Sequence, residues 1–310
     1  MKGGRQSAET GAAFLMIAGM TIIGVVDNYV VRIAELVGLW QFHFIRSLVA
    51  LPLIGLIAAL GAGSLRMLRP GAVALRSLLV AIAMLFYFSA AALMPLAQAL
   101  AGLFTSPIFV LLLTVAFTGQ RIGPRRILAV ACGFAGIIFV LQPDPNDFDL
   151  TILVPVAGGM FYAMGAIVTR SMCAREDTLA MLAAMVLSLG LMGAVGLAIL
   201  SVFSPDPAAG PDGFVTRGWV WPIWPIFPLI VMQAVGTTVA VYMLIKAYQI
   251  GEPSRVAVFE YSVMVSGPLY AWVVMGQPLG LWQVLGIGLI ILAGCIIAIR
   301  SAQIEESVSA

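Results

Sequence analysis

The stretch Phe117–Gln142, FTGQRIGPRRILAVACGFAGIIFVLQ, returns in altered form at Val274–Ile299 as VMGQPLGLWQVLGIGLIILAGCIIAI. The aligned pairs are Gly119 with Gly276, Gln120 with Gln277, Gly123 with Gly280 and Leu128 with Leu285. Each copy then continues into an apolar segment rich in small residues. Small residues let membrane helices approach closely, because lipid supplies no hydrophobic drive for helix association. The chain is therefore predicted to contain a duplicated helical unit.

The composition indicates that lipid is the solvent of this protein. The chain has 310 residues, of which 62% are hydrophobic and only 10% charged, and its mean hydropathy is +1.07. Soluble domains are about one quarter charged. A net charge of +2 gives no strong field that would attract nucleic acid. We therefore expect an integral membrane protein with the lipid bilayer, and no nucleic acid, as a partner.

The apolar stretches predict ten membrane-spanning helices, since a helix needs about 20 mostly apolar residues to cross a bilayer. The predicted spans are 12–32, 40–60, 73–93, 96–118, 126–142, 150–170, 178–203, 220–246, 254–275 and 280–300. Proline, glycine and charged residues separate them, as in QPDPNDFD and SPDPAAGPDGF. The least distinct break lies near Glu35–Leu39. The predicted fold class is an all-α integral membrane protein.

The basic residues predict the orientation of these spans. With the N-terminus in the cytoplasm, nearly all of the 16 lysines and arginines lie on the cytoplasmic side, as the positive-inside rule requires. Only Arg32 and Arg217 fall outside, and Arg46 lies within the membrane. We therefore predict that both termini are cytoplasmic.

Ten spans divide into two halves of five, and an odd number turns the second half over relative to the first. Inverted repeats of this kind are a recurring transporter plan, with the substrate site near the midplane where the halves meet. Duplication without transport is the alternative. The predicted organisation is a cytoplasmic tail 1–11, a first repeat 12–142, a periplasmic linker 143–149, a second repeat 150–300 and a cytoplasmic tail 301–310.

The segment Gly251–Arg300 resembles the EamA-type branch of the drug/metabolite transporter superfamily. The matching positions are Gly251, Glu252, Ser254, Glu260, Tyr261, Gly276, Pro278, Gly286 and Gly294. The chain departs from the family pattern at Gln120 and Gln277, where glutamate is usual. The resemblance, which covers nearly the whole chain, implies ten helices in two five-helix repeats in the bacterial inner membrane. Its members transport amino acids, nucleosides, vitamins, S-adenosylmethionine and drugs.

Ionisable residues at membrane depth indicate function, because each costs about 2.5–3.5 kcal/mol on insertion scales when it is not neutralised. Arg46 has a planar fork suited to a carboxylate, and a structural ion pair with Asp27 is the alternative. Asp27 could hold a substrate amine or carry a proton, or pair with Arg46 or Arg32. These residues predict a polar wall of a central cavity within Gly24–Leu48.

Two further ionisable residues are candidates for proton coupling. His43 is the only histidine, and histidine is the side chain that ordinarily titrates near physiological pH. A proton relay and a hydrogen-bonded histidine near the lipid headgroups are its alternatives. Glu260 lies in the ninth span, where a carboxylate must find a partner, bind a cation or take up a proton. We expect Glu260, with Asp27 and His43 as alternatives, to couple transport to protons.

Aromatic residues at membrane depth complete the predicted site. Tyr87, Tyr162 and Tyr261 could line a cavity and stack on a substrate, and ordinary packing is the alternative. Gln233 could bond across helices. The predicted substrate-binding residues are Arg46, Glu260, Asp27, Tyr87, Tyr162 and Tyr261.

These observations favour a secondary transporter for a small zwitterionic metabolite, an amino acid or a derivative, that works by alternating access. S-adenosylmethionine, a nucleoside, a vitamin or a cationic drug is the alternative substrate, and a membrane-embedded enzyme or a scaffold is the alternative class. No nucleotide-binding, metal-binding or hydrolase motif occurs, and three scattered cysteines form no redox motif. We expect no catalytic residues, metal or cofactor, and a monomer or homodimer.

Overall fold

The computed structural model describes residues 2–118, 124–142, 149–203, 206–250 and 259–293. This part of the chain is helical and contains no strand. Its longer helices are α1 (Lys2–Asp27), α3 (Leu39–Ala59), α4 (Pro70–Leu93), α8 (Leu153–Met172), α9 (Thr178–Phe203) and α10 (Phe227–Ile250). The shorter helices are α2 (Val30–Leu36), α5 (Leu96–Leu103), α6 (Ser106–Thr118), α7 (Pro124–Leu141) and α12 (Val263–Met275), with one turn of 3-10 helix at η1 (Leu150–Ile152) and at η2 (Gly210–Gly213). A last helix runs over Leu281–Ala293.

The lengths of these helices agree with a multi-pass membrane protein. Within the described ranges, six helical segments are long and apolar enough to cross a membrane. Four shorter apolar helices occupy the other predicted spans: Leu96–Val110, Ala131–Leu141, Val263–Met275 and Leu281–Ala293. Large apolar side chains such as Leu191 and Val195 of α9 are exposed on the outside of the bundle, as a lipid-facing surface requires. The count of ten membrane crossings stays a prediction.

Several predicted features lie outside the described residues. They are Gln120, Cys295, the Gly251–Ser254 turn, the tail 301–310 and the linker 143–149 apart from Asp149. The predicted tail 1–11 stays a prediction; its described residues are helical, since α1 begins at Lys2.

The predicted eighth span, 220–246, is corrected at its start. The helix begins at Phe227, and residues 220–226 lie before it, with a bend at Trp221 and a turn at 224–226. Pro222 and Pro225 explain the difference, because proline has no amide hydrogen to donate and resists the interior of a helix. The exposed rings of Trp219, Trp221 and Trp224 lie in the segment that precedes the helix rather than in its first turns.

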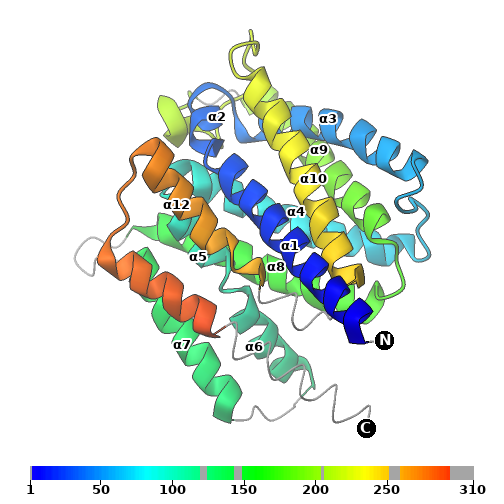
Figure 1. Ribbon diagram of the computed structural model, residues 1–310. Helices are drawn as coiled ribbons and strands as arrows, with labels where there is room; N and C mark the ends of the chain where they lie inside the picture. The colour runs from blue at the N-terminus through cyan, green and yellow to red at the C-terminus, as the bar shows by residue number, and fades with distance from the viewer. Residues whose placement is uncertain (1, 119–123, 143–148, 204–205, 251–258, 294–310) are drawn as a thin grey trace.

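Helix α1 lies between α10 and α12 on the face of the bundle that Figure 1 shows. Helix α4 packs on α8 and α9, and α3 contacts α9 and α10. Glycine permits a close approach of α1 to α12, since a Cβ atom at Gly24 would lie 2.8 Å from the backbone nitrogen of Gly267 in α12. This packing brings the polar end of α1 against α4, α10 and α12.

The first span is interrupted at Asn28–Tyr29, between α1 and α2. The Asn28 side-chain amide donates to the carbonyl oxygens of Gly24 (2.6 Å) and Gly267 (3.0 Å). It therefore takes the Gly24 oxygen that the Asn28 backbone amide would use in a continuous helix. The break leaves Asp27 as the last residue of α1.

The fourth and ninth spans are interrupted as well. A turn at Phe104–Thr105 separates α5 from α6, and a turn at Tyr261–Ser262 precedes α12. Pro107 favours the first break, because it cannot donate an amide hydrogen to Leu103. The Phe104 and Tyr261 rings meet with centroids 5.4 Å apart, so the two breaks lie together in the bundle.

Arg217 joins the loop between α9 and α10 to the C-terminal end of α2. Its guanidinium donates to the carbonyl oxygens of Ala34 and Val37 in and after α2, and to those of Ala208 and Gly210 in its own loop. Arg217 is only 9% exposed. The loop therefore depends on one side chain for four hydrogen bonds.

Replacing Arg217 with methionine is expected to destabilise the protein by about 2–4 kcal/mol, because four carbonyl groups lose a charged donor and part of them stay shielded from water. Thermal unfolding of the purified protein in detergent measures the loss. The control is Arg32→Met, since Arg32 is exposed on α2. Equal unfolding temperatures for the two variants would contradict a fastening role for Arg217.

Candidate functional site

Asp27 is a buried carboxylate held by neutral donors. It is 4% exposed. The Tyr87 hydroxyl of α4 donates to its Oδ2 atom (2.8 Å), and the Gln233 amide of α10 donates to its Oδ1 atom (2.8 Å). Each carboxylate oxygen thus accepts a hydrogen bond from a different helix.

Arg46 of α3 lies next to this carboxylate but bonds elsewhere. Its Nη2 atom donates to the Thr237 hydroxyl of α10 (3.0 Å), and its guanidinium carbon lies 4.9 Å from the centre of the Phe88 ring. Its charge acts on Asp27 through space, yet among the described residues no hydrogen bond or ion pair joins the two. The described residues therefore do not show the direct ion pair with Asp27 that was the alternative for Arg46.

His43 lies one turn before Arg46 and is fully buried. Its ring packs against Phe42 and Phe88, with centroid distances of 4.9 and 5.0 Å. Neither ring nitrogen has a hydrogen-bond partner in the part of the chain that the structure describes. The expectation of a hydrogen-bonded histidine near the headgroups is corrected accordingly.

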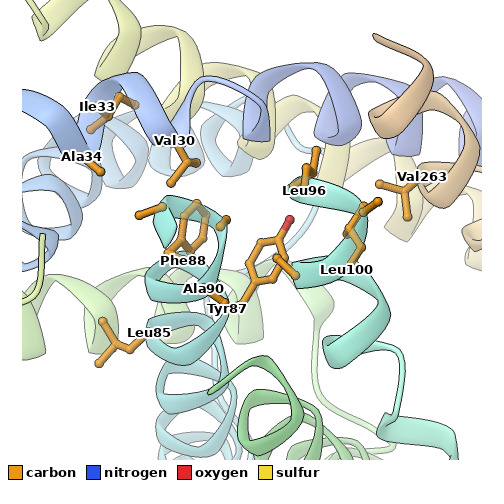
Figure 2. Close-up of a cluster of buried hydrophobic side chains, with 14 of the residues drawn as sticks. Val30, Ile33, Ala34, Leu85, Tyr87, Phe88, Ala90, Leu96, Leu100 and Val263 are labelled. Atoms are coloured by element: carbon orange, nitrogen blue, oxygen red, sulfur yellow. The ribbon is translucent and has the colours of Figure 1, made fainter. Parts of the chain in front are cut away.

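The walls of this cluster are apolar. Figure 2 shows Tyr87 and Phe88 projecting from the end of α4 among apolar side chains that include Val30, Leu96 and Leu100. These apolar side chains shield the buried polar groups from solvent, so each such group depends on its neighbours in the protein. We call Asp27, Tyr87, Gln233, Arg46 and Thr237 the Asp27–Arg46 cluster.

The other predicted site residues lie in different surroundings. Tyr162 of α8 is 41% exposed, and it lies within electrostatic range of Glu260 and of Arg76 in α4. Arg76 donates to the Thr169 hydroxyl (3.2 Å). Tyr261 packs on Phe104 at the helix break. Tyr162 thus has charged residues near it other than those around Asp27.

The structure brings together Asp27, Tyr87, Arg46 and His43, four of the predicted residues, with Gln233. It adds Thr237 and Phe42, which the sequence interpretation did not single out. A signal for Thr237 exists, because Gln233 and Thr237 are spaced i, i+4 and so share one face of an apolar helix.

The cluster offers unused hydrogen-bonding capacity of both kinds. Among the described residues, Arg46 Nη1, a donor, and Gln233 Oε1, an acceptor, are buried without a partner. The Asp27 carboxylate lies near Arg46, and the guanidinium of Arg46 lies over the Phe42 and Phe88 rings. Such an arrangement suits a ligand that carries an acceptor for Arg46 and a donor for Asp27 or Gln233.

Two curated relatives have names that state a cargo. A protein of Rhizobium johnstonii named riboflavin transporter is 27% identical over 300 residues, which cover 94% of this chain and 91% of the relative. A protein of Rickettsia bellii named S-adenosylmethionine uptake transporter is 25% identical over 241 residues, which cover 78% of this chain and 75% of the relative.

A solved crystal structure shares the fold. It matches with a TM-score of 0.64 at 18% identity and covers 96% of this chain and 99% of its own. The model of the EamA-like transporter family matches twice, over residues 10–142 and 149–299, and so spans nearly the whole sequence. The chain is therefore a multi-pass membrane protein that belongs to the EamA-like transporter family.

Proposed function

We propose that the protein is a secondary transporter that moves a small metabolite across the bacterial inner membrane by alternating access, with the Asp27–Arg46 cluster as its substrate site. The observation that carries this proposal is a buried carboxylate and a partly buried guanidinium, each held by neutral partners, because charge at membrane depth is costly and marks function. Glu260, Tyr162 and Tyr261 belong to the same pathway in this proposal.

Contacts between the two halves support an inverted repeat, with repeats at 12–142 and 150–300. The alignment that pairs Gly119 with Gly276 also pairs Phe104 with Tyr261, the positions where the fourth and ninth spans break and touch. It likewise pairs Gly133 with Ile290 and Gly136 with Ala293. A Cβ atom at Gly136 would meet Ile290, and one at Gly133 would meet Ala293. Such exchanged contacts are what a two-fold relation produces.

The proposed substrate is a zwitterionic amino-acid derivative, with its carboxylate on Arg46 and its amine on Asp27. S-adenosylmethionine is the first compound to test, because it has such an amino-acid end and appears in the name of the Rickettsia bellii relative. Its purine ring could pack against aromatic residues such as Phe42 and Phe88 near Arg46. The relatives' names give no support for a free amino acid.

Riboflavin is the second candidate, because it appears in the name of the Rhizobium johnstonii relative, whose match extends over most of both chains. A thermal-shift comparison tests both compounds, since a ligand that binds only the folded state stabilises it by about 2.7 kcal/mol at 100 times its Kd. We expect S-adenosylmethionine to raise the unfolding temperature of the native protein and of the exposed control Arg32→Gln, but not that of Arg46→Gln. If riboflavin alone raises the unfolding temperature, the substrate is a planar ring compound rather than a zwitterion. If neither compound raises it, both assignments are contradicted.

The proposed orientation places both termini in the cytoplasm. A reporter fused after Arg300 is expected to report the cytoplasm, and one inserted between Asp206 and Gly213 is expected to report the periplasm. The same side for both fusions would contradict the ten-span arrangement, because the two positions are separated by three predicted spans.

Proton coupling is proposed for Glu260, with Asp27 and His43 as the other candidates. A carboxylate that takes either a proton or a substrate cation makes the two species compete, which exchange requires. Glu260→Gln imitates the protonated state and is expected to abolish the response of uptake to an imposed pH gradient. The measurement is proteoliposome uptake with and without the gradient. A variant that still follows the gradient would move the proton site to Asp27 or His43.

A further inference from the structure

The separation of the Asp27 and Arg46 charges has a structural cause in helix α10. Gln233 and Thr237 are one turn apart on α10, and both are at most 9% exposed. Gln233 donates to Asp27 (2.8 Å), and Thr237 accepts from Arg46 (3.0 Å). The same Thr237 hydroxyl donates to the Gln233 carbonyl oxygen (2.6 Å). One helix face therefore holds both charged groups.

This arrangement is unusual for two opposite charges at low dielectric. Their attraction grows as the dielectric falls, so direct contact would ordinarily be favourable once both are buried. Here the carboxylate has Tyr87 and Gln233, and the guanidinium has Thr237 and the Phe88 ring. His43 adds a third titratable group beside Arg46. Neutral partners thus replace the contact that the charges would otherwise make.

We infer that Gln233 and Thr237 are positioning residues that hold Asp27 and Arg46 apart, so that a substrate with both a donor and an acceptor can insert between them. The inference rests on the proposed function, which makes this cluster the substrate site. A direct Asp27–Arg46 ion pair would have to break before such a substrate could bind. The apparent affinity would then be reduced in proportion to the fraction of molecules in which the pair is open.

A thermal double-mutant cycle tests the separation without any substrate. The cycle compares Asp27→Asn, Arg46→Gln and the double variant in the native background and in the Thr237→Val background. In the native protein the shifts in unfolding temperature are expected to deviate from additivity by about 2 °C or less, because the two charges attract each other only through space and lack a direct contact. With Thr237→Val, Arg46 loses its acceptor and turns to Asp27, so this deviation should grow by about 4 °C or more.

Thr238→Val provides the matched control. Thr238 is 3% exposed on the same helix, and its hydroxyl donates to the Ala234 carbonyl oxygen (2.8 Å) without bonding to either charged residue. Its background is expected to leave the deviation from additivity at its native size. Thr237→Ser keeps the hydroxyl and should return the deviation to that size. Gln233→Leu tests the other spacer and should also increase the coupling.

Uptake of labelled S-adenosylmethionine into proteoliposomes supplies the functional readout. Thr237→Val is expected to raise KM about tenfold or more with a smaller effect on the maximal rate, and Thr238→Val to change neither. Coupling that is no larger in the Thr237→Val and Gln233→Leu backgrounds than in the native protein would overturn the inference. Normal cycles with no uptake by the native protein would instead refute the proposed substrate and leave the separation standing.

Discussion

Uptake should be reduced at least 100-fold when Arg46 is replaced by glutamine. The variant removes the only positive charge found in the cluster among the described residues and leaves Asp27 buried with Tyr87 and Gln233 alone. A substrate carboxylate would then lose a charge-assisted hydrogen bond in a site that excludes water, at a cost of about 3 kcal/mol or more. Initial rates of proteoliposome uptake measure this loss.

Arg46→Lys separates charge from geometry. Lysine keeps the charge but lacks the planar fork that binds a carboxylate through two parallel hydrogen bonds. We expect affinity to fall about tenfold while the amount of folded protein in the membrane stays close to that of the native chain. Unchanged uptake in both Arg46→Lys and Arg46→Gln would remove Arg46 from the substrate site.

Gly286→Ala is expected to lower the unfolding temperature by about 5 °C or more, because it forces two helices apart. A Cβ atom at Gly286 would lie 2.5 Å from the Gly136 carbonyl oxygen and 2.9 Å from the Val140 backbone nitrogen, both in α7. Backbone atoms cannot rotate away as a side chain can, so the overlap is relieved only by moving α7 from the helix Leu281–Ala293. Figure 1 shows these two helices side by side.

Gly288→Ala is the control for this effect. Gly288 lies on the same helix, but a Cβ atom there would meet nothing within 4 Å. Its replacement should leave stability unchanged or raise it slightly, since alanine favours helix more than glycine does. Equal unfolding temperatures for the two variants would show that the α7 contact does not constrain the bundle.

Much of the fold could be predicted from the sequence, because lipid allows few backbone solutions. Backbone groups in a membrane must bond internally, so long apolar runs such as 178–203 predict helices with little ambiguity. The predicted break near Glu35–Leu39 is confirmed by the end of α2 at Leu36 and the start of α3 at Leu39. Boundaries near proline were less certain, as the late start of α10 shows.

The interruption of α1 could not be predicted, because it depends on a distant partner. Asn28 reaches the Gly267 carbonyl oxygen, 239 positions along the chain. The same limit applies to the site. Sequence identified Asp27 and Arg46 as ionisable residues in a membrane segment, but their partners Gln233 and Thr237 are on the eighth predicted span. Which neutral groups hold a buried charge depends on packing between helices rather than on local pattern.

The most direct test of the account is counterflow in proteoliposomes preloaded with unlabelled S-adenosylmethionine. Labelled compound outside should accumulate above its equilibrium level in vesicles that contain the native protein or Arg32→Gln. It should fail to do so with Arg46→Gln or with empty vesicles. The account would be contradicted by accumulation that is equal in native and Arg46→Gln vesicles, or by the absence of counterflow with S-adenosylmethionine, riboflavin, amino acids and nucleosides alike.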